Sequence, residues 1–153
     1  MLKIFKLLFT NSPVKRFRIE LSLMFYYHNK IRFLRKIFQR RLYYIYHCHI
    51  SNQAYIDESV TFIHPLAIVI GSNAIIEKNC SIYQSVTLGS TLNNQNKMPH
   101  IKENTIIYAG AKLIGDITIG KNCIIGANTV VTKNIPDNSI VVGVNKIHPR
   151  SDI

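Results

Sequence analysis

The segment Ile101–Pro136 reads, in blocks of six, IKENTI, IYAGAK, LIGDIT, IGKNCI, IGANTV and VTKNIP. Every block opens with an aliphatic residue, and four places later comes a small or β-branched one. A helix repeats its apolar residues about every 3.6 positions and a two-faced strand every two, so neither explains a strict period of six. A coil with three flat faces does, because each face takes about six residues and turns one large and one small side chain inward.

The same register continues toward the N-terminus, with two interruptions. The residues that open the blocks, here called openers, form two further sets. One set is Ile70, Ile76, Ile82 and Leu88, and the other is Ile50, Ile56 and Phe62. The run HPLAIV adds two residues before Ile70, and the polar run GSTLNNQNKMPH precedes Ile101. The pattern predicts a mainly β chain, a parallel β-helix of hexapeptide repeats in which each coil covers the apolar interior of the next. Insertions into a repeat fold lie outside and often carry the site, and each interruption contains a histidine, His64 or His100.

The basic charge of the chain is concentrated at its N-terminal end. The 153 residues carry a net charge of +11. Residues 1–49 hold eleven Lys and Arg against Glu20 alone, a net of +10, whereas residues 50–153 hold eight against seven, a net of +1. We therefore divide the chain into a basic amphipathic helical segment, residues 1–49, and a coil domain with a short C-terminal tail, residues 50–153.

Two helices are expected in the basic segment, over Pro13–Tyr27 and about Ile31–Tyr46. Ser12-Pro13 is a typical helix start. The second helix has one apolar stripe and an opposite face rich in cations; the stripe is Ile31, Leu34, Phe38, Leu42 and Ile45, and the cations are Arg32, Arg35, Lys36 and Arg40. The hairpin could cap the coil, or cap it and also contact an anionic membrane through residues 13–46. We expect no nucleic-acid partner, because no recognised motif accompanies the charge.

Cysteine usage and hydropathy suggest a cytoplasmic protein. The three cysteines give no plausible disulfide framework, and Cys80 and Cys123 fall at the small inward position of the repeat. MLKIFKLLF does not resemble a secretory signal, and no apolar run is long enough to span a bilayer. If the hairpin binds lipid, we expect peripheral contact at the inner face of the cytoplasmic membrane.

The runs IVIGSNAIIEKNCSIYQSVTLGS, IIYAGAKLIGDITIGKNCIIGANTVVTKNIP and VVGV resemble the serine-acetyltransferase-type branch of the hexapeptide acyltransferases. The resemblance covers roughly Ile50–Ile147. It implies a left-handed coil, assembled as a homotrimer, with acetyl-CoA as acyl donor in the cleft between neighbouring subunits. The left hand comes from the resemblance alone, since the general rule for parallel crossovers favours the right.

His64 falls where that branch keeps its catalytic histidine. Acetyl transfer from a thioester to a hydroxyl needs a base, and a neutral imidazole, whose unperturbed pKa is about 6.5, suits that task. The resemblance also points to small residues along the pantetheine arm and to lysines near the nucleotide phosphates: Gly89, Ala109 and Ala127, and Lys133 and Lys146. The two lysines could equally be solvated corner residues.

The acceptor is expected at the loop Gly89–His100, with Lys97, Met98 and His100 as candidate contacts. In the resembling branch an aspartate precedes the catalytic histidine, an arginine-histidine pair grips the carboxylate of serine, and a further aspartate orients the imidazole. Here those positions hold Ile63, Lys97-Met98 and His49. These changes remove charges that would hold a zwitterion, which disfavours serine as the acceptor. The remaining pattern resembles the short acetyltransferases of surface-polysaccharide synthesis, and this resemblance implies a sugar hydroxyl of capsule, O-antigen or exopolysaccharide as acceptor.

Three other functions stay open. The first is serine O-acetyltransferase of cysteine biosynthesis. The second is a metal site of the carbonic-anhydrase kind, which needs three converging histidines where the coil offers His64 and His100 beyond its entry at His49, so no metal is expected. The third is a non-catalytic scaffold that recruits partners through a trimer and the basic hairpin.

Overall fold

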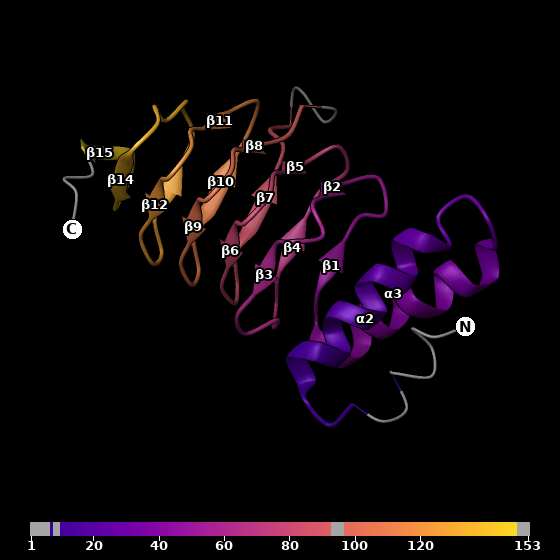
Figure 1. Cartoon of the computed structure of the whole chain (residues 1–153). Coiled ribbons are helices and arrows are strands. Elements are labelled where there is room, and N and C mark those ends of the chain that lie inside the picture. The colour runs from indigo at the N-terminus through magenta and orange to yellow at the C-terminus, as the bar shows by residue number, and fades with distance from the viewer. Residues whose placement is uncertain (1–6, 8–9, 93–96, 150–153) are drawn as a thin grey trace.

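The computed structural model describes residues 7, 10–92 and 97–149. Helices α2 (Pro13–Tyr26) and α3 (Arg32–Tyr46) precede a coil of short strands that form three faces (Figure 1). Face A contains β1 (His49–Ile50), β4 (Val69–Ile70), β7 (Thr87–Gly89), β10 (Lys112–Ile114) and β13 (Val130–Val131). Face B contains β2 (Tyr55–Ile56), β5 (Ile75–Ile76), β8 (His100–Ile101) and β11 (Thr118–Ile119). Face C contains β3 (Thr61–Phe62), β6 (Ser81–Ile82), β9 (Ile106–Ile107), β12 (Ile124–Ile125), β14 (Ser139–Val142) and β15 (Lys146–Pro149).

The strands pair in parallel from coil to coil, except that β15 turns back against β14. The residues that open the six-residue blocks stack in register, as Leu113 shows by pairing with Leu88 on one side and Val131 on the other. These openers are buried apart from Ile56, which is half-buried. Burying one such side chain contributes about 1.5–3 kcal/mol, so the stacked openers are the main source of stability. The predicted parallel β-helix and its inward register are confirmed.

The corners between faces B and C are made by asparagines. Asn79, Asn104, Asn122 and Asn138 all have positive φ, between 54° and 60°. Asparagine tolerates this left-handed conformation better than most residues. Their amides also form a column, in which each Nδ2 donates to the next Oδ1 at 3.3, 3.2 and 3.0 Å. The column joins successive coils outside the packed interior.

The helical hairpin covers the N-terminal end of the coil (Figure 1). Ser12 caps α2 by accepting a bond from the backbone N–H of Lys15, and Pro13 follows it, as predicted. The ring of Phe17 packs edge-on against Tyr46 and Phe62, with centroids 5.1 and 5.2 Å away. The expected cap over the end of the coil is therefore present. No helix among the described residues is long and apolar enough to cross a membrane.

A fully buried carboxylate joins the two helices. Glu20 on α2 lies 2.8 Å from Nη2 of Arg41 on α3 and 3.6 Å from Nε of Arg16. The hydrogen bond to Glu20 raises the pKa of Arg41. The pair ties α2 to α3 at a point that the sequence pattern did not single out.

The stripe predicted for the second helix is wrong at both ends. Phe38 and Leu42 are buried as expected, but Ile31 and Ile45 are 47% and 52% exposed. The helix α3 buries residues of one side only, and Tyr46 takes the place predicted for Ile45.

Candidate active site

His64 lies in the turn between β3 and β4, at the corner where face C passes to face A. The two extra residues of HPLAIV form a small loop here, in which Pro65 is buried and His64 is exposed. The N–H of Leu66 donates to the carbonyl of His64 at 2.8 Å, and Ala67 adopts a φ of 53°. The N–H of Ala67 also donates to the carbonyl of Tyr46, which ties the loop to the end of α3. The interruption therefore turns the imidazole out of the packed interior.

The nearest aromatic neighbour of His64 is Tyr83, one coil further on. The two ring centroids are 6.4 Å apart and the planes meet at 65°. The ring of Tyr83 in turn lies 4.9 Å from that of Tyr108 on the next coil. Within the described ranges, no carboxylate forms an ion pair with His64. A tyrosine ring therefore flanks this imidazole, and the sequence pattern gave no reason to single out Tyr83.

Two of the candidate cofactor residues share this corner with His64. Ala109 follows β9 and Ala127 follows β12, each in a turn from face C to face A. Successive turns are joined by backbone bonds, from Ser85 N–H to the carbonyl of Leu66, then from Gly110 to Gln84, and from Asn128 to Ala109, at 2.8 to 3.0 Å. Small side chains at Ala109 and Ala127 leave the backbone of this corner open to an extended ligand. We call this row of turns the C–A corner.

The remaining candidates lie elsewhere. Gly89 ends β7 and Lys133 follows β13, so both stand at the opposite edge of face A, where the chain turns toward face B. Lys146 opens β15 on face C. Face A thus separates His64, Ala109 and Ala127 from Gly89 and Lys133, and one chain does not bring the two groups together.

The loop expected to hold the acceptor lies at the A–B edge of the coil. Its residues 97–99 lead into β8, which begins at His100. Met98 packs beside Gly71, where an added methyl group would overlap the thioether. The side chain of Met98 therefore holds the loop against the coil.

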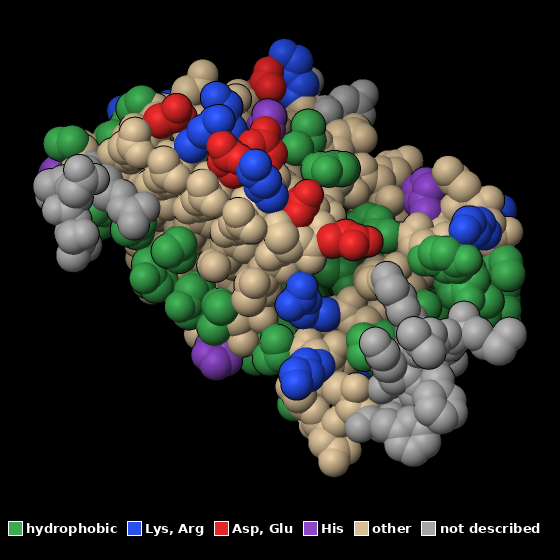
Figure 2. Space-filling model, viewed as in Figure 1, with side chains coloured by type: hydrophobic (Ala, Val, Ile, Leu, Met, Phe, Trp, Pro, Cys, Tyr) green, Lys and Arg blue, Asp and Glu red, His purple; other side chains and the backbone are tan. Residues whose placement is uncertain are grey.

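Each basic residue of this loop end has an acidic partner. Nζ of Lys97 lies 2.6 Å from a carboxylate oxygen of Asp116, and both side chains are more than half exposed. Nε2 of His100 lies 2.7 Å from Oε1 of Glu77, whose other oxygen accepts from the backbone N–H of Glu103. Figure 2 shows charged side chains gathered on this part of the coil. Sequence reasoning missed Asp116 and Glu77, because both contacts depend on how the loop returns to the coil.

A third acidic residue nearby, Glu103, joins two lysines. Glu103 lies 3.0 Å from Nζ of Lys78 and 2.9 Å from Nζ of Lys121, and these contacts lower the pKa of its carboxyl. Among the described residues, no group of three or more His, Cys, Asp or Glu is arranged to hold a metal ion.

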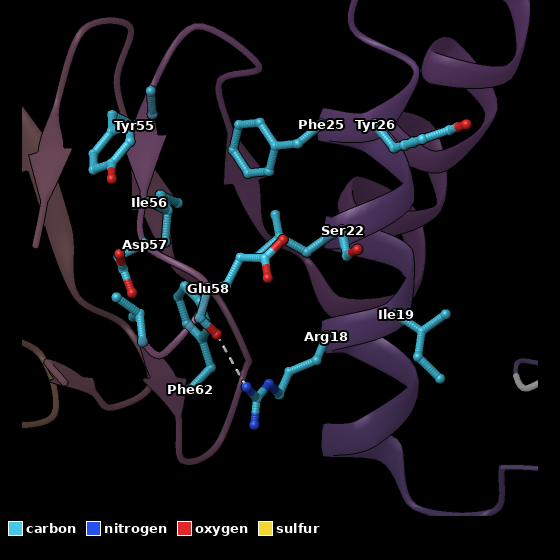
Figure 3. Close-up of a pocket in the computed structure, with 13 residues that line it drawn as sticks. Arg18, Ile19, Ser22, Phe25, Tyr26, Tyr55, Ile56, Asp57, Glu58 and Phe62 are labelled. Carbon is cyan, nitrogen blue, oxygen red and sulfur yellow. Dashed lines mark hydrogen bonds between the residues drawn. The ribbon is translucent and has the colours of Figure 1, made fainter. Parts of the chain in front are cut away.

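A cavity lies away from all these residues, between α2 and the first coil (Figure 3). It has a volume of about 590 Å³ and apolar walls that include Phe25 and Tyr55. At its edge Arg18 donates to the backbone carbonyl of Glu58 at 3.2 Å. None of the candidate catalytic or cofactor residues lines it.

Comparisons with known proteins show that the coil is similar to transferases. Residues 98–133 match the family described as bacterial transferase hexapeptide (six repeats). A serine acetyltransferase of Buchnera aphidicola subsp. Schizaphis graminum is 42% identical over 108 residues, which are 69% of this chain and 41% of that protein. A truncated serine acetyltransferase apoenzyme superposes with a TM-score of 0.81 at 31% identity, over 88% of this chain and 57% of that one. A serine acetyltransferase in complex with CoA gives a TM-score of 0.74 at 32% identity, over 82% and 52%.

These relatives correct one expectation from the sequence. The relatives named above are serine acetyltransferases, so the predicted sugar acceptor and role in surface-polysaccharide synthesis are wrong, and the alternative reading, a serine O-acetyltransferase, has the better support. The chain spans about half the length of the relatives it matches. Over that span the expected architecture is confirmed: the chain is a left-handed β-helix of hexapeptide repeats with two N-terminal helices, similar to serine acetyltransferases.

Proposed function

We propose that this chain transfers the acetyl group of acetyl-CoA to the hydroxyl of serine, with His64 as general base. The observation that carries the proposal is the C–A corner, where the exposed His64 shares one row of turns with Ala109 and Ala127. The similar serine acetyltransferase solved with CoA supports the choice of donor.

The chemistry needs one proton acceptor and a site for the developing oxyanion. Neutral His64 takes the hydroxyl proton of serine as the oxygen attacks the thioester carbonyl. The tetrahedral intermediate then collapses, the C–S bond breaks, and the imidazolium returns its proton to the CoA thiolate. O-acetylserine and CoA leave. Backbone N–H groups beside the corner would stabilise the oxyanion, as in other acyl transfers.

The acceptor site is proposed at the loop end, with Lys97 and Asp116 as its charged pair. Serine is a zwitterion, and it needs a cation for its carboxylate and an anion for its ammonium group. Lys97 and Asp116 supply both charges 2.6 Å apart and both remain accessible to solvent. In the resembling branch an aspartate precedes the catalytic histidine, and here that position holds the uncharged Ile63. Asp116 thus offers a negative charge that Ile63 lacks. His100, already bound to Glu77, would hold the loop and not the substrate.

The site is proposed to form between neighbouring copies in a homotrimer. His64, Ala109 and Ala127 lie on one edge of face A, and Gly89, Lys97 and Lys133 lie at or beyond the other. A three-fold arrangement of coils would bring one edge of each chain against the opposite edge of the next. Light scattering that finds a stable monomer at micromolar concentration during turnover would contradict this arrangement.

A second proposal concerns location and does not depend on acetyl transfer. We propose that the basic hairpin, residues 13–46, makes peripheral contact with the anionic inner face of the cytoplasmic membrane. Its support is the net positive charge of the hairpin, whose one acidic residue, Glu20, is buried.

The purified chain tests the proposed reaction directly. We expect thiol release from acetyl-CoA when serine is added and little without it. His64→Asn and His64→Ala should retain acetyl-CoA binding and lose about 10²–10⁴-fold in kcat, the usual scale of general-base assistance. Retention of most activity by His64→Asn would refute the role of the imidazole. Acetyl-CoA binding without any serine-dependent thiol release would refute serine as the acceptor.

A further inference from the structure

The outward side of α3 exposes large apolar side chains at helical spacing. Phe33, Ile37, Arg40 and Tyr44 follow one another at i, i+4, i+7 and i+11, so they share one side of the helix. Phe33 and Tyr44 are 72% and 71% exposed. We call these four residues the outer stripe. It lies opposite the buried residues Phe38, Leu42 and Tyr46, which pack onto the coil. Exposed apolar groups gathered in this way mark an interaction surface.

The charge on this side of the helix has one sign. Arg32, Lys36 and Arg40 are all exposed, and α3 contains no aspartate or glutamate. The sole acid of the hairpin is Glu20, which is buried against Arg41 and cannot neutralise the outward cations. Arg35 differs from its neighbours, because it is only partly exposed and its Nε is buried. The outward cations therefore present a positive surface to any partner.

A basic groove runs beside the outer stripe, between α3 and β1. It encloses about 290 Å³, and its polar lining includes Lys36, Arg40, Tyr43 and His49. The ring of Tyr43 stands edge-on to that of His49, with centroids 6.3 Å apart. Ammonium, guanidinium, phenol and imidazole groups can all donate to phosphate oxygens. The groove therefore suits the phosphate of a headgroup.

We propose that the outer stripe and the basic groove bind the surface of an anionic lipid bilayer, with α3 lying in the plane of the interface. Cations, aromatic rings and aliphatic side chains on one helix side, without acids, are the composition of helices that lie at membrane interfaces. A soluble phosphate would explain the groove but leave the exposure of Phe33, Ile37 and Tyr44 without a role. The inference rests on the proposed membrane contact of the hairpin and assigns it to one face.

A single tryptophan can report on this face, because the chain contains none. Phe33→Trp should show a blue-shifted emission with vesicles of phosphatidylcholine and phosphatidylglycerol, and no shift with phosphatidylcholine alone. High salt should reverse the shift, since it screens the cations. The matched control is Tyr55→Trp, at a position 58% exposed on face B of the coil, whose emission should not change.

Charge substitutions test the groove by vesicle flotation. Each cation near an anionic surface contributes about fivefold to binding, so Lys36→Ser/Arg40→Ser should weaken partitioning about thirtyfold. Lys15→Ser/Lys102→Ser removes the same net charge from α2 and the coil, and it should change partitioning by less than about threefold. Circular dichroism verifies that both variants keep their helices. Equal losses in the two variants would mean that net charge and not this face drives binding.

Other results would overturn the inference in distinguishable ways. Flotation of the unaltered chain without any shift in Phe33→Trp would place the membrane contact on another face. A blue shift that grows with protein concentration in the absence of vesicles would assign the stripe to a second copy of the chain. Loss of vesicle binding in inorganic phosphate, but not in sodium chloride of equal ionic strength, would make the groove a soluble-anion site. Failure of flotation with every vesicle would remove the membrane contact itself, and the serine assay would be unaffected.

Discussion

Replacing Glu20 with glutamine should destabilise the helical hairpin more than any comparable change at an exposed acid. The carboxylate is fully buried, whereas its partners Arg41 and Arg16 are 34% and 47% exposed. Breaking a fully buried ion pair costs about 3–5 kcal/mol, and breaking an exposed one costs about 0–1. Since one side of this pair reaches water, the free energy of unfolding should fall by about 2 kcal/mol.

The atoms of the pair support that intermediate value. Glutamine keeps an oxygen that can accept from Nη2 of Arg41, as Oε1 does at 2.8 Å. The other carboxylate oxygen is buried without a hydrogen-bond partner among the described residues, so the new NH₂ group would have no acceptor there. A buried donor left unpaired costs about 1–3 kcal/mol.

Thermal unfolding at fixed protein concentration measures the effect. For a chain of this size, about 2 kcal/mol corresponds to a fall in Tm of roughly 4–8 °C. Glu58→Gln is the matched control, because Glu58 is exposed and uses its backbone carbonyl to accept from Arg18. Hydrogen exchange should show the loss in α2 and α3 before the coil. If Glu20→Gln lowers Tm no more than Glu58→Gln does, the buried pair contributes nothing to stability and the reasoning fails.

Three further predictions concern the loop, the acceptor and the core. Gly71→Ala should displace Met98 and raise the KM for serine about tenfold with kcat changed less. Met98→Ala should raise the KM by a similar factor, because it also removes the contact that holds the loop. Unchanged kinetics in both variants would mean that Met98 does not hold the loop. Lys97→Met and Asp116→Asn should each raise the KM for serine about tenfold, the scale of a charged hydrogen bond, while 3-hydroxypropionate, which lacks the ammonium group, should be insensitive to Asp116→Asn; equal sensitivity would remove Asp116 from the acceptor site. Burial raises the pKa of Cys80 from 9.0 to about 11, so the thiol loses its proton at lower pH in the unfolded chain than in the folded one. The free energy of unfolding should therefore fall as the pH rises from about 9 to about 11. Urea unfolding across this range should show a smaller fall in Cys80→Ala, and an identical fall would show that this thiol is not the cause.

The core was predictable from the sequence, because each face of a coil must turn an apolar residue inward at a fixed interval. Leu88, Leu113 and Val131 stack as the period of six requires, although a long polar loop lies between the first two. The turn at His64 was predictable for a related reason. Two residues that do not fit the period cannot enter the stack, so they must leave it.

Contacts made outside the period were not predictable. Asp116 and Lys97 are 19 positions apart, and His100 and Glu77 are 23 apart, with the loop in between. The spacing of these residues in the sequence does not show where the loop Gly89–His100 returns to the coil. The acceptor was misjudged for the same reason, because the loss of charge at Ile63 and Met98 gave no information about Asp116, which we propose as the anion of the acceptor site.

The turns of the C–A corner are evenly spaced along the axis of the coil. Neighbouring strands in a sheet are about 4.8 Å apart, so Ala109, two coils from His64, stands about 10 Å along the axis and Ala127 about 14 Å. These intervals are fixed by backbone bonds and not by side chains, so a point substitution at the corner leaves them unchanged. The distance from His64 to any point on an extended acyl-carrying arm bound along the turns would therefore be set by a whole number of these intervals. Insertion of one complete coil between His64 and Ala109 would keep the inward register of the repeat, and it would move a thioester bound along the turns one step away from His64.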